Sequence, residues 1–282
     1  SLMRSFYSNS VRTQAFSGSW ANIATHYLPG KGLTVRTRLP AMRLSIVVPC
    51  FNEEGNVAQV VDRAVAVGRR VASELEIIVV DDGSTDETRA VLRVLQRTTP
   101  ELRVVDHLRN RGYGAAVRSG LDASSMDYVF LTDGDGQFDL EELPAAIALL
   151  RDYDVVAGYR VDRRDGWWRE LWGRTWTGIV NQAFGLRVRD VNCAFKLVPR
   201  ALLRVSELRS EGALISAELL AEARRAELSI VQCPVSHYPR VSGRQTGASL
   251  PVVGRAMVEL ASAVLRPRVA KPLRGENVSR RT

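Results

Sequence analysis

The chain has 282 residues, of which 45% are hydrophobic and 25% charged, and it carries a net charge of +8. This length is enough for one large domain or two small ones, and the composition is ordinary for a soluble globular protein. The basic balance favours phosphate-bearing partners, namely nucleotides, nucleic acid or an anionic membrane face.

The cysteines and the apolar segments exclude several classes of protein. Cys50, Cys193 and Cys233 are widely spaced, and the sequence has neither a Cys-x-x-Cys pair nor a Cys/His zinc spacing. We therefore expect reduced thiols in a cytosol-like compartment. No uninterrupted apolar segment has the length of a bilayer span, and the N-terminus lacks the apolar region of a signal peptide, so neither feature is expected.

Residues 1–41 show no sustained hydrophobic period and mix polar residues with scattered aromatics. We expect an irregular arm, made basic by Arg4, Arg12, Lys31, Arg36 and Arg38. This arm is interpreted either as a solvated tail or as a segment that contacts a membrane surface.

Short β-branched runs recur from residue 44 onwards. They predict strands at 44–48, 76–80, 102–106, 128–131, 155–158 and 228–231, and Pro49 is expected to end the first strand. A further strand is expected after residues 190–196.

Amphipathic segments between these runs predict helices. Asn52 is expected to cap a helix that continues to residue 70, and Ser84 with Glu87 forms a capping-box pattern for a helix to residue 98. Asp139, followed by Glu142, is expected to cap another, and further helices are predicted near 110–120, 213–222 and 252–265. The alternation is typical of an α/β fold, a mostly parallel sheet with helices on both faces.

Carboxylates follow several predicted strands, at the edge where such sheets bind ligands: Glu53, Asp81, Asp82, Asp133 and Asp135. Asp133 and Asp135 lie one residue apart, with glycines between and after them. Two such carboxylates repel each other unless a cation lies between them, and hard oxygen ligands suit Mg²⁺ or Mn²⁺. Alone, the pair could be a surface turn. The convergence of acids from three strands favours a metal–nucleotide site.

The segment Gly112–Tyr113–Gly114 does not fit the known glycine-rich cofactor loops. It lacks the third glycine of Gly-x-Gly-x-x-Gly and follows the third strand rather than the first, and no Gly-x-x-x-x-Gly-Lys phosphate loop occurs. It is interpreted as a tight turn packed against the sheet or as a substrate contact.

Residues 159–189 interleave arginines with tryptophans: Arg160, Arg163, Arg164, Arg169, Arg174, Arg187 and Arg189 with Trp167, Trp168, Trp172 and Trp176. The pattern suits nucleic-acid binding, a membrane-interface segment, or a helix that buries tryptophans in its own core. A later loop, 237–247, carries Arg240 and Arg244 among small residues. It suits either a flexible phosphate clamp or an ordinary basic loop.

Several motifs, taken in order, resemble those of family 2 glycosyltransferases. The segments 45–53 (SIVVPCFNE), 80–88 (VDDGSTDET) and 133–137 (DGDGQ) are similar to the opening, second and metal-binding motifs of that family. Three further segments resemble its polyprenyl-phosphate, or dolichol-phosphate mannosyltransferase-like, branch: 110–114 (NRGYG), 185–190 (GLRVRD) and 193–196 (CAFK). The resemblance covers residues 44–249.

This resemblance implies a GT-A fold, Rossmann-like, with a nucleotide-diphosphate sugar, a divalent metal and inversion at the anomeric carbon. It implies that Pro49, Phe51, Glu53 and Asp82 hold the nucleoside and that Asp133, Asp135 and Gln137 hold Mg²⁺ or Mn²⁺, Asp133 facing the donor too. It places Arg160, Arg174 and Thr177 near the acceptor phosphate, and Arg240 and Arg244 on a loop that closes on the diphosphate.

The chain departs from the family pattern at three points. Thr177 stands where serine is expected, and the stretch around Trp167 contains more tryptophans than expected for the family. The C-terminal membrane helices of many members are not seen in this sequence. The domain expectation is a basic arm (1–41), a GT-A domain (42–250), and a C-terminal helix with a basic tail (251–282). We expect a cytoplasmic protein, peripheral at the inner face of the membrane.

The expected reaction moves a hexose from a GDP- or UDP-sugar to a polyprenyl phosphate, with Asp135 and Arg160 as candidate catalytic residues. A phosphate acceptor is already ionised, whereas a hydroxyl acceptor needs a carboxylate base, for which Glu218 is the candidate. Transfer to a hydroxyl, in a polysaccharide, glycolipid or small molecule, is the alternative. A nucleic-acid-binding module would not explain the converging acids, so no nucleic-acid partner is expected. A sugar nucleotidyltransferase is a further enzyme alternative, but the sequence lacks the glycine-rich basic opening loop that such enzymes use.

Overall fold

The computed structural model describes residues 42–161, 167–240 and 250–265. In this part of the chain the strands are β1 (Arg43–Cys50), β2 (Glu74–Asp81), β3 (Leu102–Asp106), β4 (Tyr128–Leu131), β5 (Val155–Val161), β6 (Lys196–Pro199) and β7 (Ile230–Ser236). The α-helices are α2 (Val57–Val71), α3 (Thr88–Thr98), α4 (Tyr113–Ala123), α5 (Leu143–Ala148), α6 (Trp167–Phe184), α7 (Arg200–Val205), α8 (Ile215–Arg225) and α9 (Leu250–Leu265). The 3₁₀ turns η1 (Leu140–Glu142) and η2 (Leu149–Arg151) flank α5.

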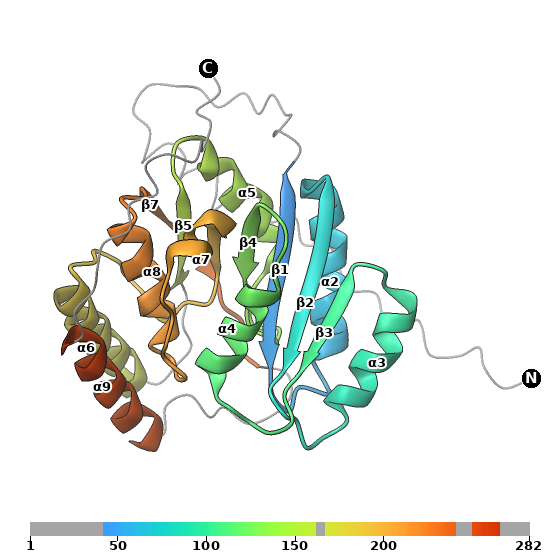
Figure 1. Ribbon diagram of the computed structural model, residues 1–282, viewed down its shortest axis with the longest axis horizontal. Helices are drawn as coiled ribbons and strands as arrows, with labels where there is room; N and C mark the ends of the chain where they lie inside the picture. The colour runs from blue at the N-terminus through green and yellow to red at the C-terminus, as the bar shows by residue number, and fades with distance from the viewer. Residues whose placement is uncertain (1–41, 162–166, 241–249, 266–282) are drawn as a thin grey trace, which may run out of the picture. The chain divides into compact units, whose positions relative to one another are not determined.

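The described strands form one sheet in the order β3-β2-β1-β4-β6-β5-β7 (Figure 1). Neighbouring pairs are parallel except those of β6, which runs antiparallel to both β4 and β5. The mostly parallel α/β sheet expected from the sequence is therefore confirmed. The carboxyl ends of β1, β2 and β4 meet at one edge, because Cys50 is paired with Asp81 and Val47 with Leu131.

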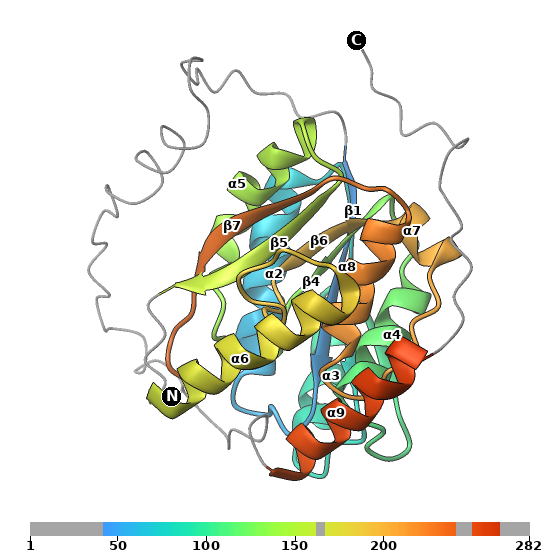
Figure 2. The ribbon, with the colours of Figure 1, turned by 90° about the vertical axis from the view of Figure 1, so that its left-hand side faces the viewer.

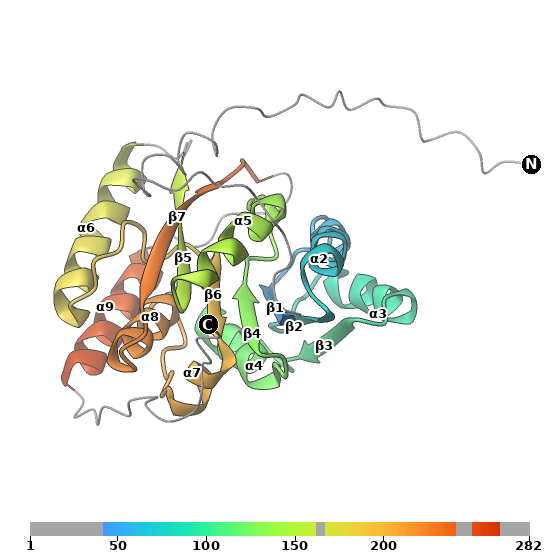
Figure 3. The same cartoon turned by 90° about the horizontal axis from the view of Figure 1, so that it is seen from above.

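Helices cover both faces of the sheet. Figure 3 shows α2 and α5 on one face and α4, α7 and α8 on the other. On the second face, α6 and α9 lie side by side beyond α8 (Figure 2). Trp176 and Val180 of α6 and Leu260 of α9 belong to the same buried core as Val117 of α4 and Leu219 of α8. Among the described residues, no helix is both long and apolar enough to cross a membrane.

The sequence located the elements well but misplaced several boundaries. β3 has the predicted bounds, whereas β1 continues through Pro49, which pairs with Val80 of β2. The prediction that Pro49 ends the strand is therefore wrong. The predicted cap at Asn52 is also wrong, because α2 begins at Val57 and Asn52 adopts a left-handed φ of 56°.

The predicted capping box of Ser84 and Glu87 is also wrong, because Ser84 bonds to the neighbouring loop and not to the helix. Helix α3 begins at Thr88 with no side-chain cap from Glu87, and the Ser84 hydroxyl accepts a hydrogen bond from the Asn52 amide. The cap at Asp139 is confirmed, since its side chain accepts from the Glu141 amide, although it begins the 3₁₀ turn η1.

Candidate functional site

The loop after β4 carries the two carboxylates that the sequence singled out. Gly134 lies so close to the end of β1 that a Cβ there would be 3.0 Å from both Cys50 Cβ and the Pro49 carbonyl oxygen. The loop is therefore pressed against the β1 edge, and a side chain at position 134 would separate them. Oδ1 of Asp133 is buried and has no hydrogen-bond partner among the described residues.

The ionisation of Asp133 and Asp135 is strongly affected by burial. Burial and the charge of Asp135 raise the pKa of Asp133 to about 7, although a hydrogen bond from Tyr113 and the nearby Arg160 and Lys196 oppose this rise. Burial raises the pKa of Asp135 too. The pair is thus held in an arrangement that costs free energy when both carboxylates are charged and no cation is near.

These residues fit a divalent metal. An unpartnered carboxylate oxygen and a second carboxylate one residue away supply hard ligands, and a cation would remove the repulsion between them. Gln137 donates through Nε2 to the Tyr238 carbonyl at 2.7 Å, which leaves its Oε1 as the side chain's possible ligand atom. No group of three or more His, Cys, Asp or Glu side chains suited to a metal occurs among the described residues. A metal here would therefore complete its shell with other ligands, such as substrate phosphate.

The segment after β7 is tied directly to this loop. The Tyr238 amide donates to the Gln137 carbonyl at 2.8 Å, and Phe138 forms an isolated antiparallel bridge with His237. The Phe138 ring also packs against the His237 ring. Two residues further on, Arg240 forms an ion pair with Glu53. Two residues assigned to the donor by resemblance, Glu53 and Arg240, are thus brought together from opposite parts of the chain.

Asp82 anchors the loop before α4. Its Oδ1 accepts from the Arg111 amide at 3.0 Å and lies 2.5 Å from His107 Nδ1, while its Oδ2 accepts from the Gly112 amide at 2.8 Å. Gly112 has a φ of 98°, which a residue with a side chain rarely adopts. The glycine is therefore required for the turn that presents its amide to Asp82.

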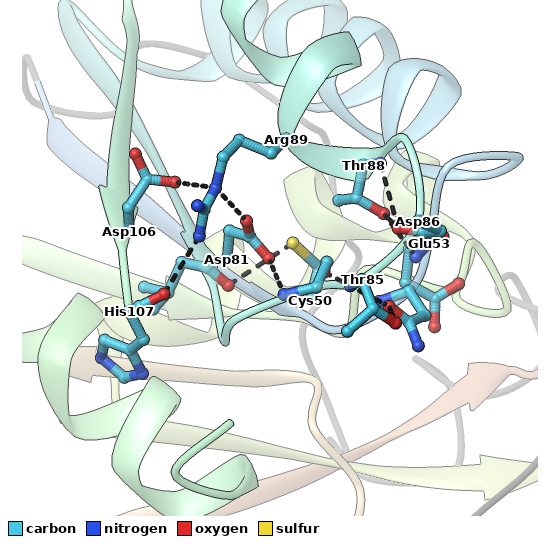
Figure 4. Close-up of polar contacts among 12 residues, drawn as sticks. Cys50, Glu53, Asp81, Thr85, Asp86, Thr88, Arg89, Asp106 and His107 are labelled. Carbon is cyan, nitrogen blue, oxygen red and sulfur yellow. Dashed lines mark hydrogen bonds and ion pairs between the residues drawn. The ribbon is translucent and has the colours of Figure 1, made fainter. Parts of the chain in front are cut away.

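A second set of polar contacts joins the ends of β1, β2 and β3 (Figure 4). Arg89 reaches from α3 to both Asp81 and Asp106, at 3.2 and 3.3 Å. The Glu53 amide donates to Thr88 Oγ1 at 2.8 Å. Asp81, counted among the converging acids, is therefore fully buried in an ion pair and does not face a ligand.

Arg160 is fixed by a two-pronged ion pair with Asp190. Its Nε and Nη2 lie 2.6 and 3.0 Å from the two carboxylate oxygens. Burial lowers the pKa of Arg160, but the contacts with Asp190 outweigh it and leave the pKa above its usual value. Nearby, the fully buried Lys196 donates to the backbone carbonyls of Val191 and Cys193, and burial lowers its pKa. The Arg160 guanidinium is thus a permanent positive charge whose orientation is fixed by Asp190.

The other predicted site residues lie in different surroundings. Glu218 is buried in the first turn of α8, where Oε2 accepts from the amides of Arg209 and Ser210 at 2.9 and 2.8 Å. Thr177 is buried and Arg174 exposed on α6, while Phe51 is exposed just after β1. Arg244 lies outside the described residues, as do the predicted basic arm and tail.

Sequence reasoning missed three residues that support the site. They are His107, which contacts Asp82; Asp190, which orients Arg160; and Tyr113, whose side chain hydrogen-bonds with Asp133 and Ser216. Each of the three follows a strand end or lies within a motif described above, and this position in the sequence could have marked it as a candidate site residue. Their partners are 20 or more residues away in sequence, and no local pattern gives such a pairing.

Comparison with known proteins gives a consistent result. The model of the family described as "Glycosyl transferase family 2" matches residues 45–210. The undecaprenyl-phosphate 4-deoxy-4-formamido-L-arabinose transferase of Edwardsiella ictaluri (strain 93-146) is 33% identical over 207 residues, which are 71% of this chain and 61% of that protein. The dodecaprenyl-phosphate galacturonate synthase of Rhizobium johnstonii is 32% identical over 175 residues, 61% of this chain and 52% of that protein. The chain thus spans less than two thirds of the length of these relatives.

Solved structures share the fold at lower sequence identity. Glucosyl-3-phosphoglycerate synthase from Mycobacterium tuberculosis, in complex with Mn²⁺, UDP and glucosyl-3-phosphoglycerate, has a TM-score of 0.62 and 22% identity. The likeness covers 80% of this chain and 81% of that one. The complex of the same protein with Mn²⁺ and UDP-glucose has a TM-score of 0.61 and 23% identity, over 79% of each chain. At this identity the likeness confirms the fold class expected from the sequence.

Proposed function

Since the chain belongs to glycosyltransferase family 2, we propose that it transfers a hexose from a nucleotide-diphosphate sugar to a polyprenyl phosphate, with inversion at the anomeric carbon. The relatives that act on undecaprenyl and dodecaprenyl phosphate support this acceptor class. The observation that carries the proposal is the half-buried pair Asp133 and Asp135 at the sheet edge, with a buried oxygen of Asp133 that has no partner among the described residues.

The metal ligands would be Asp133, Asp135 and Gln137. When bound, Mg²⁺ or Mn²⁺ supplies charge neutralisation for the diphosphate leaving group. The chain contributes the position: Gly134 holds the loop against β1, and Gln137 is fixed by its bonds to Tyr238. Ligands held this rigidly bind the metal without first having to be ordered.

The donor would lie along the ends of β1 and β2. Phe51 is exposed beside this edge, and Glu53 and Asp82 are held in place by Arg240 and by the Gly112 loop. Opening of the Arg240–Glu53 ion pair would free Arg240 to meet the diphosphate, and Glu53 to meet the nucleoside. Arg244 lies further along the same segment and is proposed to join it.

The acceptor phosphate would be bound on the α6 side of the site. Arg160, oriented by Asp190, would attract and orient the phosphate, with Arg174 and Thr177 as additional contacts. A phosphate acceptor is ionised at neutral pH and needs no base, so positioning and charge are what the chain must supply. Glu218, the candidate base for a hydroxyl acceptor, already accepts two backbone hydrogen bonds, which favours a structural role.

We further propose that the enzyme binds a membrane surface through α6 and α9. These neighbouring helices expose apolar side chains, namely Leu171, Trp172, Ile179, Met257, Val258, Val264 and Leu265. On α9 the exposed positions 257, 258, 261, 264 and 265 form a stripe at helical spacing, opposite the buried stripe 256, 260 and 263. Arg266, Arg268, Lys271 and Arg274 follow in sequence and complement anionic lipid. A lipid-linked acceptor would be reached from such a surface.

The test is a transfer assay with Mn²⁺ or Mg²⁺, a short-chain polyprenyl phosphate and a panel of GDP- and UDP-sugars, with Asp135→Asn as the comparison. We expect metal-dependent formation of lipid-linked sugar that the variant loses by at least about a hundredfold. The productive donor would identify both the sugar and the nucleoside.

Two other results would change the assignment. Nucleotide release without a lipid product would retain the donor site and replace the acceptor, making a hydroxyl acceptor the better proposal. No turnover of any donor, together with no binding of a nucleoside diphosphate, would make the Asp133 loop an ordinary turn and overturn the proposed function.

A further inference from the structure

The segment Arg209–Gly212, between α7 and α8, is held by two carboxylates from different helices. Glu218 of α8 accepts from the first two amides of the segment, at 2.9 and 2.8 Å. Glu259 of α9 accepts from the last two, at 3.2 and 3.0 Å. Four consecutive backbone N–H groups are therefore satisfied by charged acceptors, which form stronger hydrogen bonds than neutral ones.

An open pocket lies beside this segment. A cavity of about 290 Å³ borders it, and both Glu218 and Glu259 line that cavity together with Arg255 and Val258. Arg255 adds an ion pair with the Glu211 side chain at 2.5 Å. The pocket leaves room beside the segment, so a lost acceptor would allow the segment to move toward it.

The other side of the segment touches the loop that begins α4. The Gly114 amide donates to the Glu211 carbonyl at 2.7 Å. A Cβ at Gly114 would lie 2.5 Å from the Ser210 carbonyl oxygen, and one at Gly112 would lie 2.6 Å from that of Glu211. The two backbones therefore meet directly, and a shift of one must displace the other.

The loop that begins α4 in turn contacts two of the proposed site residues, Asp82 at the donor and Asp133 at the metal. Its Arg111 and Gly112 amides bind the Asp82 carboxylate, and its Tyr113 side chain contacts Asp133 and Ser216. A continuous series of contacts thus runs from Glu259 on α9, through the segment Arg209–Gly212, to the end of β2 and the metal loop.

We infer that Glu259 is a positioning residue for the donor site. By holding the segment Arg209–Gly212 against the glycine loop, it sets the position of Asp82 and of Tyr113. This inference rests on the proposed nucleotide-sugar site and adds to it that α9, a helix far along the chain, controls the affinity for the donor. A displacement of α9 would loosen the glycine loop and weaken donor binding.

The test compares Glu259→Ala and Glu259→Gln with the control Glu207→Ala. Glu207 is an exposed carboxylate of the same neighbourhood, paired only with the Arg209 side chain among the contacts described. The affinity of the full chain for UDP and for GDP is measured by calorimetry in the presence of Mn²⁺, with donor KM, kcat and Tm alongside. All assays are run at a temperature where circular dichroism shows each variant to be folded.

Glu259→Ala is expected to weaken nucleoside diphosphate binding about tenfold and to raise donor KM with little change in kcat. Glu259→Gln keeps an acceptor oxygen and should stay within about threefold of the wild type. A lower Tm with unchanged nucleotide affinity in Glu259→Ala would overturn the inference, because it is the result of a merely structural role. An equal loss of nucleotide affinity in Glu259→Ala and Glu259→Gln would also overturn the inference, and so would the same loss in Glu207→Ala.

Two further outcomes are decisive. If Glu259→Ala does not fold, Glu259→Asp replaces it, since it withdraws the carboxylate by one methylene while keeping the charge; unchanged affinity there overturns the inference. If the wild-type chain binds neither UDP nor GDP, the proposed function fails and the inference falls with it. Wild-type binding with an unaffected Glu259→Ala rejects the inference alone.

Discussion

Asp133 gains its importance from surroundings that oppose its charge. Burial and Asp135 raise its pKa to about 7, so in the absence of metal a proton is bound at the site below neutral pH. A carboxylate must lose this proton before it ligates a metal, and metal affinity therefore increases with pH until the group is ionised.

We therefore expect the affinity for Mn²⁺ to rise about fivefold between pH 6 and pH 7 and about tenfold by pH 8, where it levels off. Calorimetric titration of metal-free protein at several pH values measures it. Tyr113→Phe removes a hydrogen bond that lowers the pKa of Asp133, so the rise should move to higher pH. An affinity that does not change between pH 6 and pH 8, or a move to lower pH in the variant, would contradict the prediction.

At this scale the sequence identified which residue types gather at the edge but not what each one contacts. Asp81 and Asp82 are neighbours with the same side chain, yet Asp81 is buried against Arg89 and Asp82 anchors the Gly112 loop. Arg89 and Gly112 lie 8 and 30 residues away along the chain. Only the folded arrangement distinguishes the two carboxylates.

At the scale of elements, the loop after β1 and the loop after β2 stabilise each other. Asn52 Oδ1 accepts from the Thr85 amide at 2.8 Å, and the Asn52 amide donates to Ser84 Oγ at 2.9 Å. These reciprocal contacts explain why both helix starts were misplaced. Asn and Ser favour caps when a local amide is free, but here their partners lie on the neighbouring loop.

The left-handed backbone of Asn52 makes a paired prediction. Asn52→Ala should lower the free energy of unfolding by about 1–2 kcal/mol. The left-handed backbone is unfavourable for alanine, and the substitution also removes the hydrogen bond from the Thr85 amide. Asn52→Gly loses the same bond but adopts the conformation freely, and should cost about 1 kcal/mol less. Urea unfolding of the three proteins decides this. Equal losses would mean that the hydrogen bond, not the backbone conformation, requires asparagine.

At the scale of the whole molecule, alternation of strands and helices predicted the class of fold but not the order of its strands. β6 lies between β4 and β5 and runs against their direction, and its four residues, Lys196–Pro199, carry no sequence signal of strand direction. Of the four parallel pairings, β1 with β2 and β2 with β3 could be expected from their short connections. The antiparallel pairings of β6 depend on where the chain returns to the sheet after the long segment that follows β5.

The exposed stripe of α9 predicts binding to lipid. Flotation with vesicles of phosphatidylglycerol and phosphatidylcholine should recover the full chain, and Val258→Glu/Leu265→Glu should reduce the recovered fraction about tenfold. Val94→Glu, at an equally exposed apolar position on α3, is the matched control and should bind as the wild type does. Failure of the wild type to float would reject a lipid partner. A dimer in solution that the double variant dissolves would identify a second copy as the partner.

The pairing of β5 with β6 has a consequence for how such enzymes diversify. The chain leaves the sheet after β5 and returns at Lys196, which pairs with Ala157 of the strand it left. Everything between, including α6 and Asp190, is therefore an insert attached at two adjacent points, and changing its length costs little closure entropy. The part of the proposed acceptor side that lies on this insert, namely Arg174, Thr177 and Asp190, can change while Arg160 on β5 and the proposed donor side, built on β1, β2 and β4, stay in place. One scaffold could in this way keep its sugar nucleotide and change what receives the sugar.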